Sequence, residues 1–214
     1  AMLKWIPKCT DLPDGLPLLE KLLRARGFDD PEAARAFLHP SRGQLIDPLR
    51  MPSMREAAEQ IRKCRDEGRA ILVYGDYDVD GVSATALTTL FLTAWGARAR
   101  HYIPSRHREG YGLSGEAVRR IAADPEVGLL VTVDCGITAV EQAQVAREIG
   151  LTLVITDHHT PGSALPAADG VVHPCIGVGY PNPHLCGAGV AFKLAWAIAR
   201  NLSGSLRVSS QFRE

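Results

Sequence analysis

The sequence lacks an excess of charge of either sign, because 24 lysines and arginines balance 24 aspartates and glutamates. No overall field therefore draws the chain toward nucleic acid or an anionic membrane, and a polyanion would have to be held by a local patch. The sequence also lacks any apolar run near the ~18 residues that a membrane span needs. No signal peptide precedes Met2. We therefore expect a protein without a membrane anchor.

Paired cysteines are missing as well. The five cysteines are scattered, odd in number and without a CxxC pair. This pattern argues against a disulfide framework and a zinc ribbon, and it favours a reducing compartment. The sequence thus predicts a cytoplasmic protein, whose 214 residues are enough for one domain with an appendage.

What the sequence does contain is a regular alternation of strands and helices. Residues 1–50 are rich in proline and turn signals and predict a helical lead-in, with short helices at 16–26 and 31–38. Residues 51–214 predict one α/β domain, a mostly parallel sheet flanked by helices on both faces. The predicted strands cover 70–75, 98–103, 129–133, 151–156 and 170–172, and the predicted helices cover 53–66, 82–95, 114–123, 138–149 and 188–200. The strands are continuous apolar runs, which fits burial on both sides.

Three of these strands end on acidic or imidazole side chains. The first strand leads into Asp76, Asp78 and Asp80, the third into Asp134, and the fourth into Asp157-His158-His159. Alternate residues of an extended chain share one face, about 6.5–7 Å apart at each step. Carboxylates so placed repel one another and have raised pKa values unless a cation lies among them. Because ligands bind at the carboxyl ends of parallel strands, the sequence predicts a metal site at this edge.

Other interpretations of these residues are less satisfactory. A calcium-binding EF-hand loop that opened at Asp76 would need a glutamate at its twelfth position, where Leu87 stands. A haloacid-dehalogenase-type nucleophile motif would not need the adjacent histidines. A purely structural role suits a lone Asp134 better than all three sites together. His173, in a proline-rich loop, is expected to be a surface or locally bonded side chain rather than a ligand.

Five segments resemble a known family. Residues 75–81 (GDYDVDG) together with the triplet 157–159 (DHH) resemble the DHH phosphoesterase superfamily. Residues 109–113 (EGYGL), 131–136 (VTVDCG) and 186–193 (CGAGVAFK) resemble its RecJ group of single-strand-specific 5′→3′ exonucleases. The resemblance spans roughly residues 45 to 200 and implies hydrolysis of single-stranded DNA to mononucleotides in repair and recombination.

The resemblance also implies a two-metal site that holds Mn²⁺, with Mg²⁺ as the alternative. Asp134 is then the bridging ligand, while Asp78 and Asp80 each favour one ion and Asp76 is a further ligand or support. His158 completes a mixed nitrogen and oxygen set, which suits Mn²⁺ better than Mg²⁺. His159 is assigned to the scissile phosphate or to proton transfer. Asp157 is expected to orient an imidazole.

Substrate-binding residues are expected around a basic run that includes Arg98, Arg100 and Arg106. Arginines contact phosphates and an exposed tyrosine can stack a base. The resemblance implies that Arg106 and Tyr111 hold the 5′ end of the strand. Backbone donors at Ser83, Gly187 and Gly189 could add phosphate contacts, although the two glycines could equally serve close helix packing. The expected partners are single-stranded DNA, a single-strand binding protein and a repair helicase.

The sequence departs from the family in one respect. DHH enzymes carry a fourth metal-binding aspartate downstream of the segment like 187–193, but here Asp169 is the only aspartate after Asp157. We therefore expect a fragment of a longer protein that is weakly active or inactive. Two alternatives stay open: a DHH phosphodiesterase acting on oligoribonucleotides or cyclic dinucleotides, and a non-catalytic RecJ-like replication scaffold.

Overall fold

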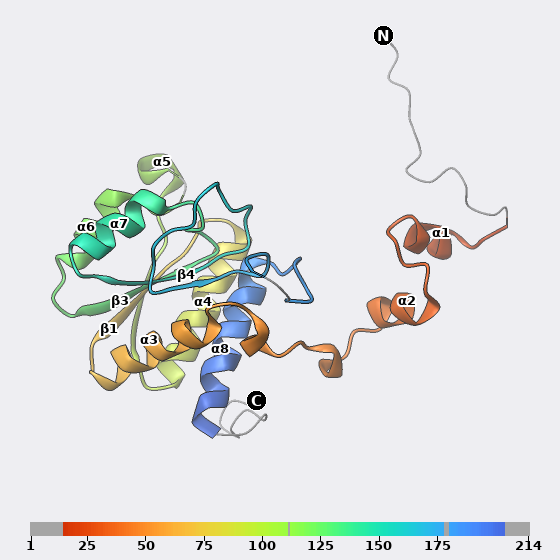
Figure 1. Ribbon diagram of the computed structural model, residues 1–214, viewed down its shortest axis with the longest axis horizontal. Helices are drawn as coiled ribbons and strands as arrows, with labels where there is room; N and C mark the ends of the chain where they lie inside the picture. The colour runs from red at the N-terminus through yellow and green to blue at the C-terminus, as the bar shows by residue number, and fades with distance from the viewer. Residues whose placement is uncertain (1–14, 111, 178–179, 204–214) are drawn as a thin grey trace, which may run out of the picture. The chain divides into compact units, whose positions relative to one another are not determined.

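The computed structural model describes residues 15–110, 112–177 and 180–203, which divide into two units (Figure 1). The first unit ends at Leu45 and the second begins at Ile46. The first unit contains helices α1 (Leu18–Arg24) and α2 (Pro31–Leu38) and the 3-10 turn η1 (Arg42–Gln44). Helix α2 has the predicted bounds, and the Asp30 carboxylate caps it by accepting the N–H groups of Glu32 and Ala33.

The second unit is a five-stranded, all-parallel sheet with the strand order β2-β1-β3-β4-β5. Its strands are β1 (Ala70–Tyr74), β2 (Arg98–Tyr102), β3 (Val127–Val133), β4 (Thr152–Thr156) and β5 (Gly170–Val172). Its helical elements are η2 (Pro48–Arg50), α3 (Met54–Asp66), α4 (Val79–Ala94), α5 (Arg106–Glu109), α6 (Gly115–Ala122), α7 (Val140–Glu148) and α8 (Gly187–Ser203). The predicted α/β class and parallel sheet are confirmed.

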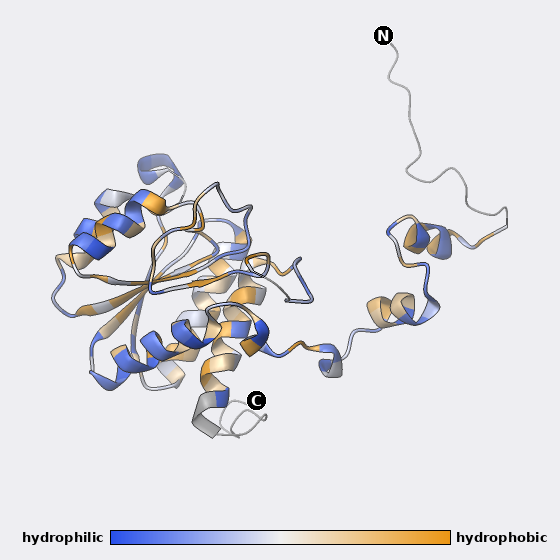
Figure 2. Cartoon of the chain, viewed as in Figure 1, coloured by the Kyte–Doolittle hydropathy of each residue, from blue (hydrophilic) through white to orange (hydrophobic). Residues whose placement is uncertain are grey.

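Helices cover both faces of the sheet (Figure 1). One core lies between the sheet and helices α3, α4 and α8, and it includes Ile61, Leu92 and Leu194. The other lies under α6 and α7 and includes Val118 and Ile121. Figure 2 shows helices α3, α6 and α7 with hydrophilic outer faces. The inner strands β1, β3 and β4 are largely buried apolar runs, as expected for a sheet covered on both sides, whereas the edge strand β2 is polar and partly exposed. No helix in the described part of the chain is long and apolar enough to span a membrane.

The segment before the sheet is fastened to the second unit. Lys193 Nζ donates to the Ile46 carbonyl oxygen at 2.6 Å, and Arg200 forms an ion pair with Asp47. The two units therefore divide at 45/46, whereas the sequence placed the boundary at 50/51.

Helix α4 begins at Val79, three residues before the predicted start at 82. Asp78 is its N-cap, and the Asp78 Oδ1 atom accepts the N–H groups of Asp80 and Gly81 at 2.9 and 3.0 Å. The expectation that three aspartates lie on one face of an extended chain is therefore wrong. Asp76 lies in the loop, Asp78 caps the helix and Asp80 lies in its first turn.

Candidate metal centre

Asp134 lies at the centre of the carboxyl edge of the sheet, directly after β3. Its backbone has a φ of 62°, in the left-handed region that non-glycine residues rarely adopt. The side chain is 1% exposed, and neither carboxylate oxygen has a hydrogen-bond partner in the described part of the chain. Burial, followed by the charge of Asp80, raises the pKa of Asp134 to about 7. A strained and buried carboxylate that accepts no hydrogen bond is costly unless a ligand compensates it.

The loop after β1 brings two further carboxylates to Asp134. Oxygen atoms of Asp76, Asp78 and Asp134 all lie within 4.8 Å of one another. Asp76 is buried, and its Oδ1 accepts the N–H of Tyr77 at 2.8 Å. Burial raises the pKa of Asp76, because the charged form loses hydration. This loop can approach the helix so closely only because residue 81 is glycine, since a Cβ there would lie 2.6 Å from the Asp76 Cβ.

Asp80 is held by the first turn of α8. Its Oδ2 accepts the N–H of Gly187 and its Oδ1 accepts the N–H of Ala188, both at 2.7 Å. Burial acts to raise the pKa of Asp80, but these two hydrogen bonds lower it below its usual range. We call this pair of contacts the Asp80 clasp. A carboxylate has about four lone-pair positions, so the clasp leaves Asp80 able to bind a cation.

The clasp changes the interpretation of Gly187. The amide that was expected to contact phosphate donates to Asp80 instead, and a Cβ on residue 187 would lie 2.2 Å from Asp134 Oδ1. Close packing therefore explains the glycine, which was one of the two alternatives. The Gly189 N–H faces the Cys186 sulfur at 3.4 Å. A phosphate contact of Gly189 remains a prediction.

The histidines of the triplet complete the site. His158 Nε2 lies 3.1 Å from Asp134 Oδ1, outside hydrogen-bond geometry, and 3.4 Å from Asp80 Oδ2. Ligand atoms of Asp134, His158 and His159 lie within 4.8 Å of one another. Asp134 thus belongs to both ligand clusters, which is the position expected of a carboxylate that bridges two metal ions.

Asp157 orients His159, as predicted. His159 Nδ1 lies 2.7 Å from Asp157 Oδ1, which also accepts the N–H groups of His158 and His159. Asp157 Oδ2 accepts the N–H of Ile137, so this carboxylate is fully used inside the fold. Burial would lower the pKa of His159, but the hydrogen bond with Asp157 and the nearby carboxylates raise it.

His173 is a supporting residue that the sequence did not assign to the site. Of the two expected states, the structure shows the locally bonded one, because the side chain is completely buried. His173 Nδ1 accepts the N–H of Cys175 at 3.0 Å, so Nε2 carries the proton and donates to the His159 carbonyl at 2.7 Å. Burial lowers the pKa of His173 and favours this neutral form. Its position 14 residues after His159 gave no sequence signal for the contact.

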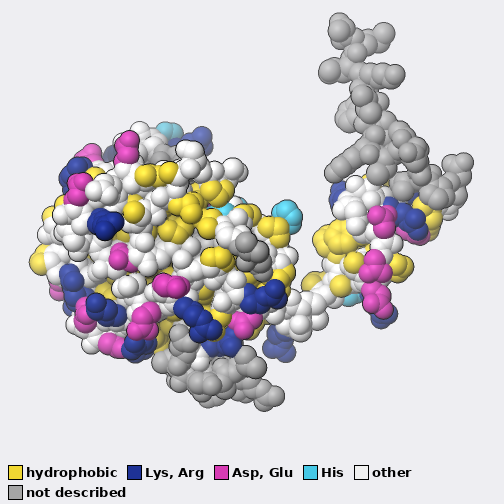
Figure 3. Space-filling view, in the orientation of Figure 1, with side chains coloured by type: hydrophobic (Ala, Val, Ile, Leu, Met, Phe, Trp, Pro, Cys, Tyr) yellow, Lys and Arg dark blue, Asp and Glu magenta, His cyan; other side chains and the backbone are white. Residues whose placement is uncertain are grey.

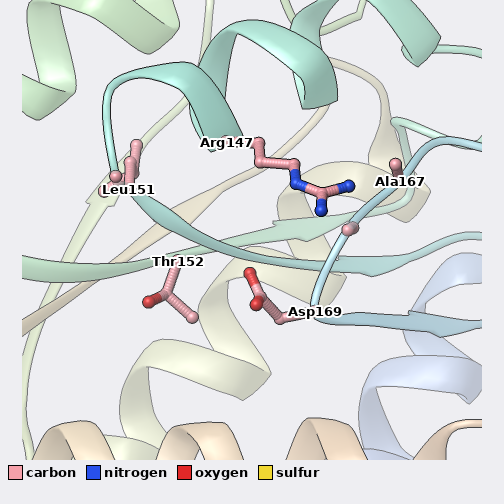
Figure 4. A pocket seen from close by; sticks show the side chains of 7 residues that line it. Arg147, Leu151, Thr152, Ala167 and Asp169 are labelled. Carbon is pink, nitrogen blue, oxygen red and sulfur yellow. The ribbon is translucent and has the colours of Figure 1, made fainter.

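The residues at this edge fit a pair of divalent cations. The fit rests on the orphaned oxygens of Asp134, on the cradle that a Cβ at position 187 would fill, and on a donor set of carboxylates and imidazoles. A cavity of about 290 Å³ adjoins His159 and is lined partly by Leu113, Ile137 and Gln142. Asp169 plays no part here. It lines a separate cavity of about 390 Å³ with Arg147 and Thr152, at the amino end of β4 (Figure 4).

The predicted substrate residues are only partly near this site. The Arg106 guanidinium lies over the ring of Tyr77, 5.4 Å from its centre, and Tyr77 stands between Asp76 and Asp78 in the sequence. Tyr111 lies outside the described residues. Ser83 lies in the second turn of α4, where its hydroxyl donates to the Val79 carbonyl at 2.6 Å. In the first turn, the N–H groups of Asp80 and Gly81 donate to Asp78.

Two members of the basic run are engaged elsewhere. Arg98 pairs with Glu126, and Arg100 pairs with Asp124 and Glu126. Arg98 and Arg100 are therefore engaged in surface ion pairs on the edge strand, and a DNA contact of either residue stays a prediction. Figure 3 shows the same mixture on one face of the molecule, where dark blue and magenta side chains are interspersed.

Together, the parallel sheet and the carboxylates and imidazoles at its carboxyl edge define an α/β domain built to hold divalent cations. The model of the DHH family, N-terminal domain, matches residues 70–211. The chain belongs to the DHH family.

Known relatives point to one branch of this family. The chain is 45% identical over 191 residues to the single-stranded-DNA-specific exonuclease RecJ of Bacillus subtilis (strain 168), covering 89% of this chain and 24% of that protein. It matches the crystal structure of exonuclease RecJ bound to manganese with a TM-score of 0.65 and 39% identity, over 74% of this chain and 40% of the other.

A second solved structure, RecJ from Thermus thermophilus in complex with Mn²⁺, matches with a TM-score of 0.68 and 34% identity. That match covers 86% of this chain and 25% of the other. The chain spans about a quarter to a third of the length of the curated relatives that it matches first.

Proposed function

We propose that this chain is the metal-binding part of a single-strand-specific 5′→3′ exonuclease that releases mononucleotides from DNA in repair and recombination. The observation that carries the proposal is the buried carboxylate of Asp134, which accepts no hydrogen bond from the described residues and belongs to both ligand clusters. The names of the relatives, single-stranded-DNA-specific exonucleases, support the choice of substrate. A cytoplasmic location and contacts with a single-strand binding protein and a repair helicase belong to the same proposal.

Mn²⁺ is the proposed metal, with Mg²⁺ as the alternative. Asp134 would bridge the two ions, Asp76 and Asp78 would bind on one side, and His158 with Asp80 would bind on the other. The mixed nitrogen and oxygen set favours Mn²⁺. When bound, two such ions supply a nucleophilic water near neutral pH and stabilise the leaving oxygen.

The remaining residues would position the DNA and handle protons. Arg106 would hold a phosphate, because a guanidinium binds phosphate oxygens in two places. His159, fixed by Asp157, would contact the scissile phosphate or carry a proton at its ring. Ser83, Gly189 and Tyr111 keep their predicted substrate roles as part of this proposal. Gly187 does not, because its amide donates to Asp80.

The test compares the chain with the full gene product on 3′-labelled single-stranded DNA in Mn²⁺. RNA and cyclic dinucleotides run in parallel, and Asp134→Asn serves as the control that removes the shared ligand. We expect stepwise shortening of DNA from the 5′ end by the gene product, and weak or no cleavage by the chain alone. Equal activity of the two would contradict the expected weakness of the chain.

The other outcomes distinguish the alternatives. Hydrolysis confined to RNA or cyclic dinucleotides would assign the protein to another branch of DHH phosphodiesterases. A metal-loaded gene product that cleaves none of the three substrates would be a non-catalytic scaffold.

A further inference from the structure

The short helix α5 carries Arg106, but apolar packing does not hold it. Helix α5 has four residues and none of them is buried. It lies between β2 and α6, in a segment that leaves the sheet at Tyr102. An element of this size has no independent stability in water. Polar contacts must therefore fix its position.

Glu109, the last residue of α5, makes most of those contacts. Tyr102 Oη donates to the Glu109 carboxylate and lies 2.6 Å from both oxygens. The Ser105 N–H donates to Oε1 at 3.2 Å, so the carboxylate closes the segment onto its own start. Arg120, on α6, donates to Oε2 at 3.2 Å, and its guanidinium lies 4.9 Å from the centre of the Tyr102 ring.

A second tyrosine holds the far end of the segment. Tyr74, the last residue of β1, is buried, and its hydroxyl donates to the Gly112 carbonyl at 3.1 Å. The ring centres of Tyr74 and Tyr102 are 5.6 Å apart, within the range of interacting aromatic pairs, and the rings are tilted by 33°. We call Tyr74, Tyr102, Glu109 and Arg120 the tyrosine brace.

The brace fixes the short helix that carries Arg106, and Arg106 contacts the loop that carries Asp76 and Asp78. Arg106 is three residues before Glu109, and its guanidinium lies over the ring of Tyr77. Tyr77 is the residue between the candidate ligands Asp76 and Asp78 in the sequence. The hydrogen bond from Tyr102 lowers the pKa of Glu109, so the carboxylate stays charged toward Arg120.

We propose that Glu109 is a positioning residue, which sets the affinity for the 5′ end of single-stranded DNA by holding α5 and Arg106 against the metal-binding edge. This inference rests on the proposed exonuclease function. Glu109 acts through Arg106 and takes no part in metal binding. Its loss therefore affects KM rather than kcat, and it leaves Mn²⁺ affinity unchanged.

The test uses the full gene product with Glu109→Ala, Tyr102→Phe and Arg106→Ala, and Glu116→Ala as the matched control. Glu116 is an exposed glutamate in the first turn of α6, with no ion pair among the described residues. We expect Glu109→Ala to raise KM for 5′-phosphorylated single-stranded DNA ~10-fold, equivalent to ~1.4 kcal/mol, with kcat within ~2-fold. Tyr102→Phe, which keeps the ring, should give a smaller increase, and Glu116→Ala none.

A double-mutant cycle separates positioning from general destabilisation. Adding Glu109→Ala to Arg106→Ala should raise KM no further, because the brace acts through Arg106. Additive effects, or a loss of kcat equal to the loss of kcat/KM, would overturn the proposal.

Hydrogen exchange provides a readout that does not depend on activity. Backbone amides of residues 103–110 should exchange faster in Glu109→Ala than in the parent, while Mn²⁺ binding stays the same. Unchanged exchange would refute the brace. Faster exchange in a protein that cleaves no DNA would leave the brace intact and reject the exonuclease function instead.

Discussion

Asp134 shows how much of the site depends on a single residue. Its left-handed backbone, burial and lack of donors all disfavour the folded state in the absence of a cation. Asparagine tolerates the left-handed region and carries no charge. We expect Asp134→Asn to raise the free energy of unfolding of the metal-free protein by ~1–3 kcal/mol, since it removes an uncompensated buried charge. Urea unfolding at pH 8 with a chelator measures this, and a destabilised variant would argue against a cation site.

Gly187 matters to the site because it has no side chain. A Cβ there would collide with the Asp134 carboxylate, so we expect Gly187→Ala to reduce stability by ~1–3 kcal/mol and to weaken Mn²⁺ binding. Isothermal titration with Mn²⁺ and thermal unfolding are the measurements. Gly189→Ala is the matched control, because its Cβ would approach the side chains of Leu185, at 3.2 Å, and Cys186, at 3.7 Å, and no carboxylate; it should preserve both quantities. Equal Mn²⁺ affinity in both variants would show that the space between residue 187 and the Asp134 carboxylate does not matter for Mn²⁺ binding.

Among the elements, the strands could be predicted to within about two residues. The inner strands β1, β3 and β4 are largely apolar runs between turn signals, whereas the polar edge strand β2 was placed by the regular alternation of strands and helices. Helix α5 was not predicted, since Arg-His-Arg-Glu has no apolar period and depends on Tyr102 for its place. The start of α4 was placed too late, because alternating aspartates look extended until one of them is recognised as a cap. The Asp80 clasp joins Asp80 to Gly187 and Ala188, which lie 107 and 108 positions further along the chain. No local sequence pattern reveals such a contact.

Helix α8 also anchors the segment before the sheet, through the ion pair between Asp47 and Arg200. Burial acts to raise the pKa of Asp47, but hydrogen bonds from Arg200 and the Leu49 N–H lower it overall. A carboxylate with a lowered folded-state pKa contributes stability above its unfolded pKa of about 3.9, and loses it as the pH falls through the folded value.

We therefore expect the parent to exceed Asp47→Asn in stability by ~0.3–1 kcal/mol at pH 6, with the difference shrinking below pH 4. Urea unfolding at both pH values checks this. A difference that stays constant, or grows in acid, would show that the ion pair does not fasten the segment.

At the scale of the whole molecule, cation binding and folding of the second unit are coupled. A ligand at about 100 times its Kd stabilises the folded state by ~2.7 kcal/mol, which corresponds to ~5–10 °C in Tm for a protein of this size. We expect saturating Mn²⁺ to raise Tm by this amount relative to chelator, and to leave Asp134→Asn unchanged. Scanning calorimetry is the measurement. A Tm of the parent that is the same in Mn²⁺ and chelator would contradict the candidate centre.

The Asp80 clasp has a further consequence at this scale. It joins the first turn of α4 to the first turn of α8, so the N-termini of two long helices converge on the carboxylates. Each helix macrodipole places roughly half a positive charge at its N-terminus. Together they supply about one permanent unit of positive charge, which partly neutralises the acidic edge before any cation arrives. The domain can therefore fold without a bound cation, and cation binding at the centre then follows the free metal concentration.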